Sequence, residues 1–456
     1  MRLPNSKDMS AEQKKVYLNA PLDGSILVTG PPGTGKTVIA FLRADTFARK
    51  YKGHASVTVM MYNKVLQRYT EGASTVDGVK VSTMHSWINR WWSKTGVSIE
   101  DQIDRYDLTC PYDEKDEAKA LGARWDKVKK KWWVSVDNYE KNRDEFDQWC
   151  PSPVGNSGPP TIGDQWTYDW TKMTLAALAD VQKKENSNLN WGHLVIDEAQ
   201  DFSKEMFNFF TLLSKQENML KLKYPPGLTV FADENQRLNV SENSTIDDIR
   251  KSLMIPSDRE FSLTRNYRNT RPIAAFAKEF YVGLQTGIPD LPDEEGDLPL
   301  VFSGNELNDS VEFIKRYAVL HDDKQIGVIV QNNKVRKKFY NKLSHRLSGE
   351  EVEVQTYASG DPEHRDTKNL DLDGPGVLTV VNKQSCKGLE FDSVFLVELQ
   401  EIDTDPSAID QFKMEMYVMC SRAREYLTLM FSNSGDAQPS FLSYLPKEDQ
   451  GLYEWS

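Results

Sequence analysis

The sequence predicts an α/β protein built on parallel sheets, and two observations carry this prediction. Apolar runs typical of strands alternate with helical patterns over residues 25–90, 190–280 and 325–432. Such alternation is typical of parallel strands joined by crossover helices. In addition, residues 28–37 contain a complete G-x-x-x-x-G-K-[ST] motif, between a short apolar run and the start of a helix.

The motif within residues 28–37 predicts a phosphate-binding loop. Its glycines let backbone N–H groups converge on phosphates, and the following helix N-terminus adds a favourable field. Lys36 is predicted to hold the β and γ phosphates, and the Thr37 hydroxyl to bind Mg²⁺. We therefore expect ATP and Mg²⁺ as cofactors. The residues of the loop expected to contact the nucleotide are Gly30, Pro31, Pro32, Gly33, Thr34, Gly35, Lys36 and Thr37.

Two later strands end in polar residues suited to ATP hydrolysis. Residues 193–196 form an apolar run followed by Asp197 and Glu198. Asp197 is predicted to bind Mg²⁺, which favours carboxylate oxygens, and Glu198 to orient and deprotonate the attacking water. Residues 228–232 form another apolar run that leads to Gln236, an amide placed to sense the γ-phosphate.

Two arginines in the second half of the chain are candidates for stabilising the transferred phosphoryl group. Arg268 lies in Arg265-Asn266-Tyr267-Arg268, and Arg422 lies in Cys420-Ser421-Arg422-Ala423-Arg424. An arginine stabilises phosphoryl charge through bidentate hydrogen bonds. A single arginine is more commonly a solvated surface residue, so this prediction depends on the complete set of motifs.

In order, these motifs resemble those of superfamily 1 helicases of the UvrD/Rep/PcrA type. The resemblance covers most of the chain outside residues 101–190. Its eight segments are Gln13, Met61–Lys64, Thr83–Ser86, Asp197–Asp201, Asp233–Gln236, Asn266–Arg268, Lys387–Phe391 and Tyr417–Ala423.

This resemblance implies two RecA-like P-loop NTPase domains, and the charge- and tryptophan-rich composition of residues 101–150 indicates a small α+β insertion in the first. The expected domains are residues 1–265, interrupted by an inserted domain and linker at 101–190, and residues 266–456. The implied activity is ATP-dependent translocation or unwinding on single-stranded DNA or a tailed duplex, in the 3′-to-5′ direction. The implied catalytic residues are Lys36, Asp197, Glu198, Gln236, Arg268 and Arg422.

The resemblance also assigns binding residues outside the phosphate-binding loop. Gln13 would read the adenine and Tyr267 would stack on it. The residues implied at the γ-phosphate or elsewhere on the nucleotide are Arg268, Gly388, Glu390 and Arg422. The residues expected to contact nucleic acid in the motor domains are Tyr62, Asn63, Lys64, Thr83, His85, Trp87 and Lys387.

The chain departs from the family pattern in two places. Residues 237–242 lack the aromatic residue that usually follows Gln236 and stacks on a base. Between Arg268 and Lys387 there are 118 residues, enough for the second motor domain but not for the large accessory subdomain that the family often inserts there. Translocation on a single strand is therefore a safer expectation than processive unwinding.

The inserted segment has its own resemblance. Cys110–Asp126 and Lys131–Val134 look like a small domain appended to some plasmid primases and mobile-element proteins. The spacing of Ala118, Leu121 and Trp125 predicts a helical face packed on a hairpin, with Trp125 and either Trp132 or Trp133 in its core. The alternative is that these rings are exposed and contact nucleic acid together with nearby lysines. Residues 151–163 are predicted to be a flexible linker. Three lysines are candidates for phosphate contacts, or alternatively form a solvated rim: Lys129, Lys130 and Lys131.

Composition limits the alternatives. A net charge of −12 argues against a passive nucleic-acid coat protein but allows a motor with local contacts. The four cysteines form no C-x-x-C pair, and no signal peptide or membrane-length apolar run is evident, so we expect a cytoplasmic protein without membrane contact. A second hypothesis is a nucleic-acid-gated ATPase switch that signals to a nuclease or other effector protein. A small-molecule kinase would leave both arginine motifs unexplained.

Overall fold

The computed structural model divides into two compact units. One unit comprises Met1–Met84, Trp191–Ser214 and Leu220–Ser456, and the other comprises His85–Asn190 and Lys215–Met219. The residues that the structure describes are 9–62, 64–70, 74, 76–97, 99, 103–155, 158–164, 166–183, 186–236, 243–368, 370–372, 374–433 and 438–456. The predicted domain boundaries remain a prediction.

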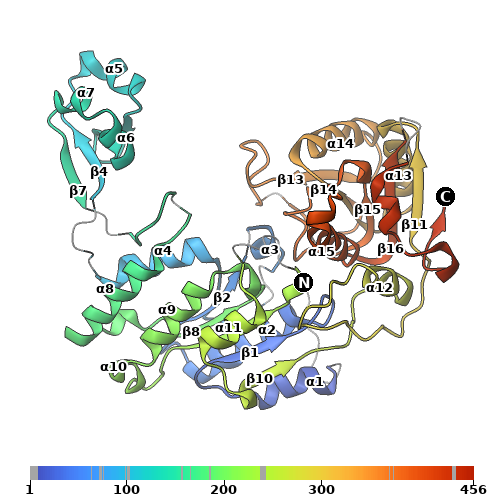
Figure 1. Ribbon diagram of the computed structural model, residues 1–456, viewed down its shortest axis with the longest axis horizontal. Coiled ribbons are helices and arrows are strands. Elements are labelled where there is room, and N and C mark those ends of the chain that lie inside the picture. Colours follow the sequence, from blue (N-terminus) through green and yellow to red (C-terminus); the bar gives the residue numbers. More distant parts are fainter. Residues whose placement is uncertain are drawn as a thin grey trace. The chain divides into compact units, whose positions relative to one another are not determined.

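The first unit contains a parallel sheet of six described strands (Figure 1, blue to yellow-green). In spatial order these are β10 (Glu260–Ser262), β1 (Ile26–Thr29), β9 (Gly227–Ala232), β8 (His193–Ile196), β2 (Val57–Met61) and β3 (Val79–Thr83). The strands β2, β8 and β9 are buried along their whole length, as expected for a sheet covered on both faces. Helix α2 (Lys36–Tyr51) packs on these three strands.

A second parallel sheet lies in the same unit (Figure 1, orange to red). Its seven described strands are, in spatial order, β13 (Glu353–Tyr357), β14 (Val377–Asn382), β12 (Gln325–Val330), β15 (Phe391–Leu396), β16 (Ala423–Ser432), β11 (Leu300–Gly304) and β17 (Glu454–Trp455). Helices α13 (Leu307–Leu320) and α14 (Asn333–Arg346) share one core with this sheet. Helices α12 (Arg271–Lys278) and α15 (Ile409–Cys420) contribute to a second hydrophobic core, which contains residues of both parallel sheets. These two sheets confirm the prediction of an α/β fold with parallel strands.

The second unit contains a smaller antiparallel sheet (Figure 1, teal). Its described strands are, in spatial order, β5 (Arg124–Asp126), β6 (Lys131–Ser135), β4 (Ile103–Leu108) and β7 (Ser152–Gly155). The short helices of this region are α5 (Lys115–Ala120), α6 (Val136–Lys141) and α7 (Arg143–Asp147). The longer helices of the unit are α4 (Met84–Thr95) and α8 (Trp170–Lys183).

Two sequence predictions about this region are wrong. Trp125 lies in strand β5 rather than on a helix, and its side chain is 47% exposed, so it is not a core residue. Residues 152–155 form the edge strand β7 rather than a linker; Pro153 is tolerated because an edge strand can omit a backbone donor. The burial of Ala118 and of Trp132 confirms the other part of the predicted core.

The remaining described helices of four residues or more are short. They are α1 (Ala11–Lys14), a π-helical turn at Lys15–Asn19, α3 (Lys64–Tyr69), α9 (Lys204–Ser214), α10 (Glu217–Leu220) and α11 (Ile246–Leu253), with a 3₁₀ segment at Ser440–Tyr444. Among the described residues, no helix has both the length and the apolar character needed to cross a membrane.

Candidate nucleotide-binding site

The order of the first sheet gathers the predicted site at one edge. Strands β1, β9 and β8 are neighbours and run parallel, so the residues that follow them emerge at the same carboxyl edge. Ligands of open parallel α/β sheets bind in the crevice outside this edge. The phosphate-binding loop follows β1, Asp233 follows β9, and Asp197 follows β8.

The phosphate-binding loop requires glycine at two of its positions. Gly33 and Gly35 have φ values of 79° and 83°, in the left-handed region that L side chains rarely adopt. A Cβ atom on Gly33 would lie 2.2 Å from Asn266 Oδ1. Gly35 is the residue immediately before α2, so its conformation turns the chain from the loop into the helix.

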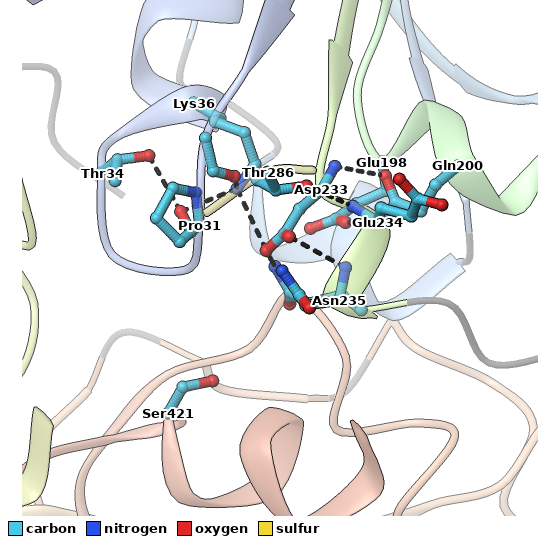
Figure 2. Close-up of polar contacts among 12 residues, drawn as sticks. Pro31, Thr34, Lys36, Glu198, Gln200, Asp233, Glu234, Asn235, Thr286 and Ser421 are labelled. Carbon is cyan, nitrogen blue, oxygen red and sulfur yellow. Dashed lines mark hydrogen bonds and ion pairs between the residues drawn. The ribbon is translucent and has the colours of Figure 1, made fainter. Parts of the chain in front are cut away.

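Lys36 lies at the centre of this loop. Its Nζ donates hydrogen bonds to the carbonyl oxygens of Gly30 (2.6 Å) and Pro31 (3.0 Å). The same ammonium is 3.9 Å from Asp233 Oδ2, and both side chains are buried. Figure 2 shows Lys36 between Pro31 and Asp233, with the Thr34 hydroxyl also donating to Pro31. The ammonium is thus held among the loop atoms that would surround a phosphate.

Thr37 and Asp197 offer oxygen ligands suited to Mg²⁺. The Thr37 hydroxyl donates to Asp197 Oδ2 at 2.6 Å, although the two residues are 160 positions apart. A hydroxyl and a carboxylate are ligands that Mg²⁺ accepts alongside water and phosphate oxygens. Burial and the neighbouring Glu198 raise the pKa of Asp197, and a bound cation would oppose this shift. The donor set therefore fits the predicted metal.

Glu198 lies beside this pair in a strained backbone conformation. Its φ of 54° is in the left-handed region, and the carboxylate accepts a 2.6 Å hydrogen bond from Gln200 Nε2. Burial alone would raise the pKa of Glu198, but the ammonium groups of Lys387 and Lys36 outweigh burial and lower it. The carboxylate is therefore ionised at neutral pH and able to accept a proton from water.

Gln200, which the sequence reasoning left without a role, connects two parts of the site. Its amide nitrogen donates to Glu198, and its Oε1 accepts a 2.9 Å hydrogen bond from the Asp233 backbone N–H. Figure 2 shows these three residues together. The signal was present in the Asp197–Asp201 motif, but only the folded sheet brings Gln200 next to β9. Gln200 therefore fixes the carboxylate of Glu198 relative to the neighbouring strand.

Gln236 links the edge of the first sheet to Arg422. Its Nε2 donates to Asp233 Oδ2 at 2.6 Å, and its Oε1 accepts a 2.7 Å hydrogen bond from Arg422 Nη2. Arg422 is fully buried just before β16 and also donates to the carbonyl oxygen of Val418. Burial and nearby Arg268 lower the pKa of Arg422 to about 10, so the guanidinium stays protonated at neutral pH.

Arg268 belongs to the same cluster. Its Nε donates to Glu390 Oε2 at 2.7 Å, and its Nη1 lies 3.4 Å from the carbonyl oxygen of Ser421. Asn266 Oδ1 accepts a hydrogen bond from the Arg268 backbone N–H at 2.9 Å. The structure therefore brings both predicted arginines together, and Glu390 forms an ion pair with one of them. Gly388 has a φ of 81°, as a turn preceding β15 requires.

The two residues expected at the adenine both lie against the phosphate-binding loop. Gln13 is buried, and its Nε2 donates to the carbonyl oxygen of Thr34 at 3.1 Å. Tyr267 has an exposed ring, and its backbone N–H donates to the carbonyl oxygen of Gly33 at 2.8 Å. An exposed ring in this position can stack on a base, but adenine recognition remains a prediction.

The expected nucleic-acid contacts are divided between exposed and buried side chains. Tyr62, at the end of β2, and Lys64, at the start of α3, are exposed, whereas Asn63 lies outside the described residues. Thr83 and Trp87 are buried, and their contact with nucleic acid remains a prediction.

Trp87 and His85 make contacts within the second unit. Trp87 is buried because its ring stacks on Trp91, with ring centroids 5.2 Å apart. His85 is partly buried, and its Nδ1 lies 3.1 Å from the hydroxyl oxygen of Tyr168.

Lys387, which was expected to contact nucleic acid, lies among acidic residues. Its ammonium is buried and lies 2.5 Å from both Asp201 Oδ2 and the carbonyl oxygen of Gln236. It is also 3.8 Å from Glu198 Oε2. Lys387 is therefore part of the network around the acidic residues in this structure, and its contact with nucleic acid remains a prediction.

Comparison with known proteins gives one family match. Residues 105–151 match the family described as Domain of unknown function (DUF5710); this segment contains most of β4, strands β5 and β6 and helices α5 to α7, and it ends before β7. No curated protein matches the chain.

The solved structures that are similar to the chain include the following two. One is the C-terminal domain of a possible DNA helicase from Lactobacillus plantarun WCFS1, with 23% identity over 41% of this chain and 97% of that chain, and a TM-score of 0.30. The other is the DUF1998 helicase MrfA bound to DNA, with 9% identity over 94% of this chain and 47% of that chain, and a TM-score of 0.48.

Proposed function

We propose that the chain is an ATP-hydrolysing translocase or helicase that acts on single-stranded DNA. The observation that carries this proposal is the hydrogen-bonded connection from Asp233 through Gln236 to Arg422. It joins residues that follow a strand of the first sheet to an arginine that precedes a strand of the second. An ATPase that couples hydrolysis to movement needs such a connection, because the nucleotide must act on two bodies at once.

The proposed chemistry assigns each group a separate task. The loop amides and Lys36 bind the phosphates, and Thr37 with Asp197 would hold Mg²⁺, which neutralises phosphate charge when bound. Glu198 accepts the proton of the attacking water, and Gln200 keeps its carboxylate in position.

Two arginines complete the proposed site: Arg422, which precedes β16 of the second sheet, and Arg268, which lies between β10 and α12. Arg422 and Arg268 stabilise the charge that develops on the transferred phosphoryl group, and such a group can contribute about 10³–10⁵ in rate. Gln236 contacts Arg422 directly, so loss of the γ-phosphate near Gln236 would alter this contact. Closing on ATP and opening after hydrolysis would then alternate the grip on a strand.

The assignment of a helicase type and of a direction of movement rests on the ordered sequence motifs. They support two RecA-like domains of the UvrD/Rep/PcrA type and 3′-to-5′ movement. Tyr62 and Lys64, which are exposed at the carboxyl edge of the first sheet, are the proposed strand contacts in this unit.

A second candidate is a nucleic-acid-gated ATPase switch that acts through a nuclease or other effector. One observation favours it: in the described part of residues 269–386, every strand belongs to the second parallel sheet. No separate accessory domain is present among those described residues, and the compact unit runs from Leu220 to Ser456 without interruption. Such a chain could turn over ATP on a strand with little unwinding.

Displacement of a labelled strand from 3′-tailed and 5′-tailed duplexes, measured with ATP turnover in the same reaction, tests the proposal. ATP-dependent displacement from the 3′ tail alone supports the helicase with the stated direction. Turnover stimulated by the tail without displacement supports the switch. Displacement from the 5′ tail contradicts the stated direction. Glu198→Gln is the control, since glutamine has nearly the shape of glutamate but cannot accept the proton of the attacking water, so the variant should remove both signals.

A further inference from the structure

The hairpin formed by β5 and β6 has a basic tip that its own contacts hold in shape. The strands pair in the register Asp126 to Lys131, leaving residues 127–130 as the turn. Asp126 Oδ1 accepts hydrogen bonds from the backbone N–H groups of Val128 and Lys129, each at 3.0 Å. Its other carboxylate oxygen pairs with Arg105 at 2.9 Å. The acidic group of the hairpin is thus already engaged in fixing the turn.

Charge is strongly segregated within this small region. Residues 124–131 contain five basic residues and one acidic residue, whereas the rest of 105–151 contains five basic and ten acidic residues. All five basic side chains of the hairpin are exposed. Among the described residues, no ion pair involves the four lysines of this segment, Lys127, Lys129, Lys130 and Lys131. The tip therefore presents uncompensated positive charge on a chain of net charge −12.

Lys130 has an uncommon backbone conformation at the tip of this turn. Its φ of 51° lies in the left-handed region, where glycine or asparagine is normally preferred. A lysine here costs backbone free energy that glycine would not. Strained residues of this kind cluster at active sites and ligand-binding segments.

Exposed apolar groups accompany the charge. The Trp125 side chain is 47% exposed, while its ring lies 5.4 Å from that of the buried Trp132. One part of the ring is thereby anchored and the other faces solvent. Val128, at the tip, is 92% exposed. A ring among lysines is the combination that binds single strands, because bases stack on the ring and phosphates pair with the ammonium groups.

We infer that the hairpin 124–131 is an ATP-independent binding site for single-stranded DNA. Lysines of the turn hold backbone phosphates, and Trp125 stacks on an unpaired base. This inference deepens the proposed function, since it gives the chain a grip that persists while the nucleotide cycle releases the other contacts. A duplex is a poorer ligand because its bases are already stacked on one another.

The test is equilibrium binding of a labelled oligothymidylate to the full chain without nucleotide, over a series of salt concentrations. The slope of log K against log[salt] is negative, and each phosphate contact on a single strand contributes about 0.7 to its magnitude. Neutralising three lysines of the turn (K127Q/K129Q/K130Q) should therefore reduce the magnitude of the slope by about 2. The matched control (K115Q/K119Q/K141Q) makes the same charge change on the helices of the same region, and it should leave the slope unchanged. Equal slopes for wild type and the turn variant would overturn the inference.

Two single variants separate binding from folding. Trp125→Ala should weaken binding about 5- to 150-fold, corresponding to about 1–3 kcal/mol of stacking. Lys130→Gly relieves the backbone strain, so it should unfold no more easily than wild type and still bind more weakly. Wild-type affinity of Trp125→Ala, or equal affinity of the wild type for duplex, contradicts the assignment to single strands.

Failure of this inference differs from failure of the proposed function. If the turn variant binds like wild type while single-stranded DNA still stimulates ATP turnover, the hairpin site is refuted and the proposed function is not. If binding without nucleotide depends on the lysines of the turn but single-stranded DNA does not stimulate ATP hydrolysis, the proposed motor function is refuted and the hairpin site is supported.

Discussion

Replacing Lys387 with methionine tests whether this lysine is a buried structural partner or a surface contact with DNA. The two side chains of the Lys387–Asp201 pair are 1% and 0% exposed. Removing one member of a buried pair leaves the other charge unpaired in a low-dielectric environment, which costs roughly 3–5 kcal/mol. Lys387→Met should therefore lower the free energy of unfolding by about that amount and also reduce ATP turnover, because Glu198 loses a neighbouring positive charge.

The assay is urea unfolding followed by circular dichroism, in which the midpoint reports stability if the slope is unchanged. Lys324→Met is the matched control: Lys324 pairs with Glu425 at 2.8 Å, but the side chains are 30% and 51% exposed. An exposed pair contributes about 0.2–1 kcal/mol, so this control should change little. Adding Asp201→Asn to Lys387→Met should recover much of the lost stability, since no buried charge is then left unpaired.

The reasoning is refuted if Lys387→Met unfolds like wild type. If its affinity for single-stranded DNA also falls at unchanged stability, the original expectation of a direct strand contact is the better description.

Three further predictions concern catalysis and stability. Lys36→Ala and Glu198→Gln should both abolish ATP turnover, but only Glu198→Gln should retain ATP binding, measured by nucleotide fluorescence; wild-type turnover in Glu198→Gln would remove its assigned role. Arg422→Ala should lower kcat by about 10³-fold or more in a steady-state assay, and turnover within tenfold of wild type would count against a γ-phosphate contact. His193 is fully buried, and burial holds its pKa well below 6.5. Stability should be full above pH 6.5 and should fall by about 1.4 kcal/mol per pH unit below it, as the unfolded state takes up a proton first. A His193→Gln variant whose stability keeps the same slope would contradict this.

Much of the nucleotide site could be predicted because its signals are local. The loop from Gly30 to Thr37 and the acids after β8 each occupy a few consecutive residues, and the chemistry restricts which residue types can be there. Parallel strands then bring these segments to one edge without further information.

The features that sequence reasoning missed depend on distant residues. The burial of Lys387 depends on Asp201, 186 positions earlier, which the fold places beside it. Trp125 fits a helical spacing with Ala118 and Leu121, yet Gly122 ends that helical segment with a φ of 90° and the chain enters β5. The role of Gln200 depends on which strand neighbours β8, which no local pattern specifies.

The most direct test of the central claim is the steady-state rate of ATP hydrolysis by the full chain, with and without single-stranded DNA. The account predicts Mg²⁺-dependent turnover that the strand stimulates strongly, and its loss in Lys36→Ala. Absence of turnover under both conditions, or turnover that single-stranded DNA does not change, would contradict an ATP-driven motor on DNA.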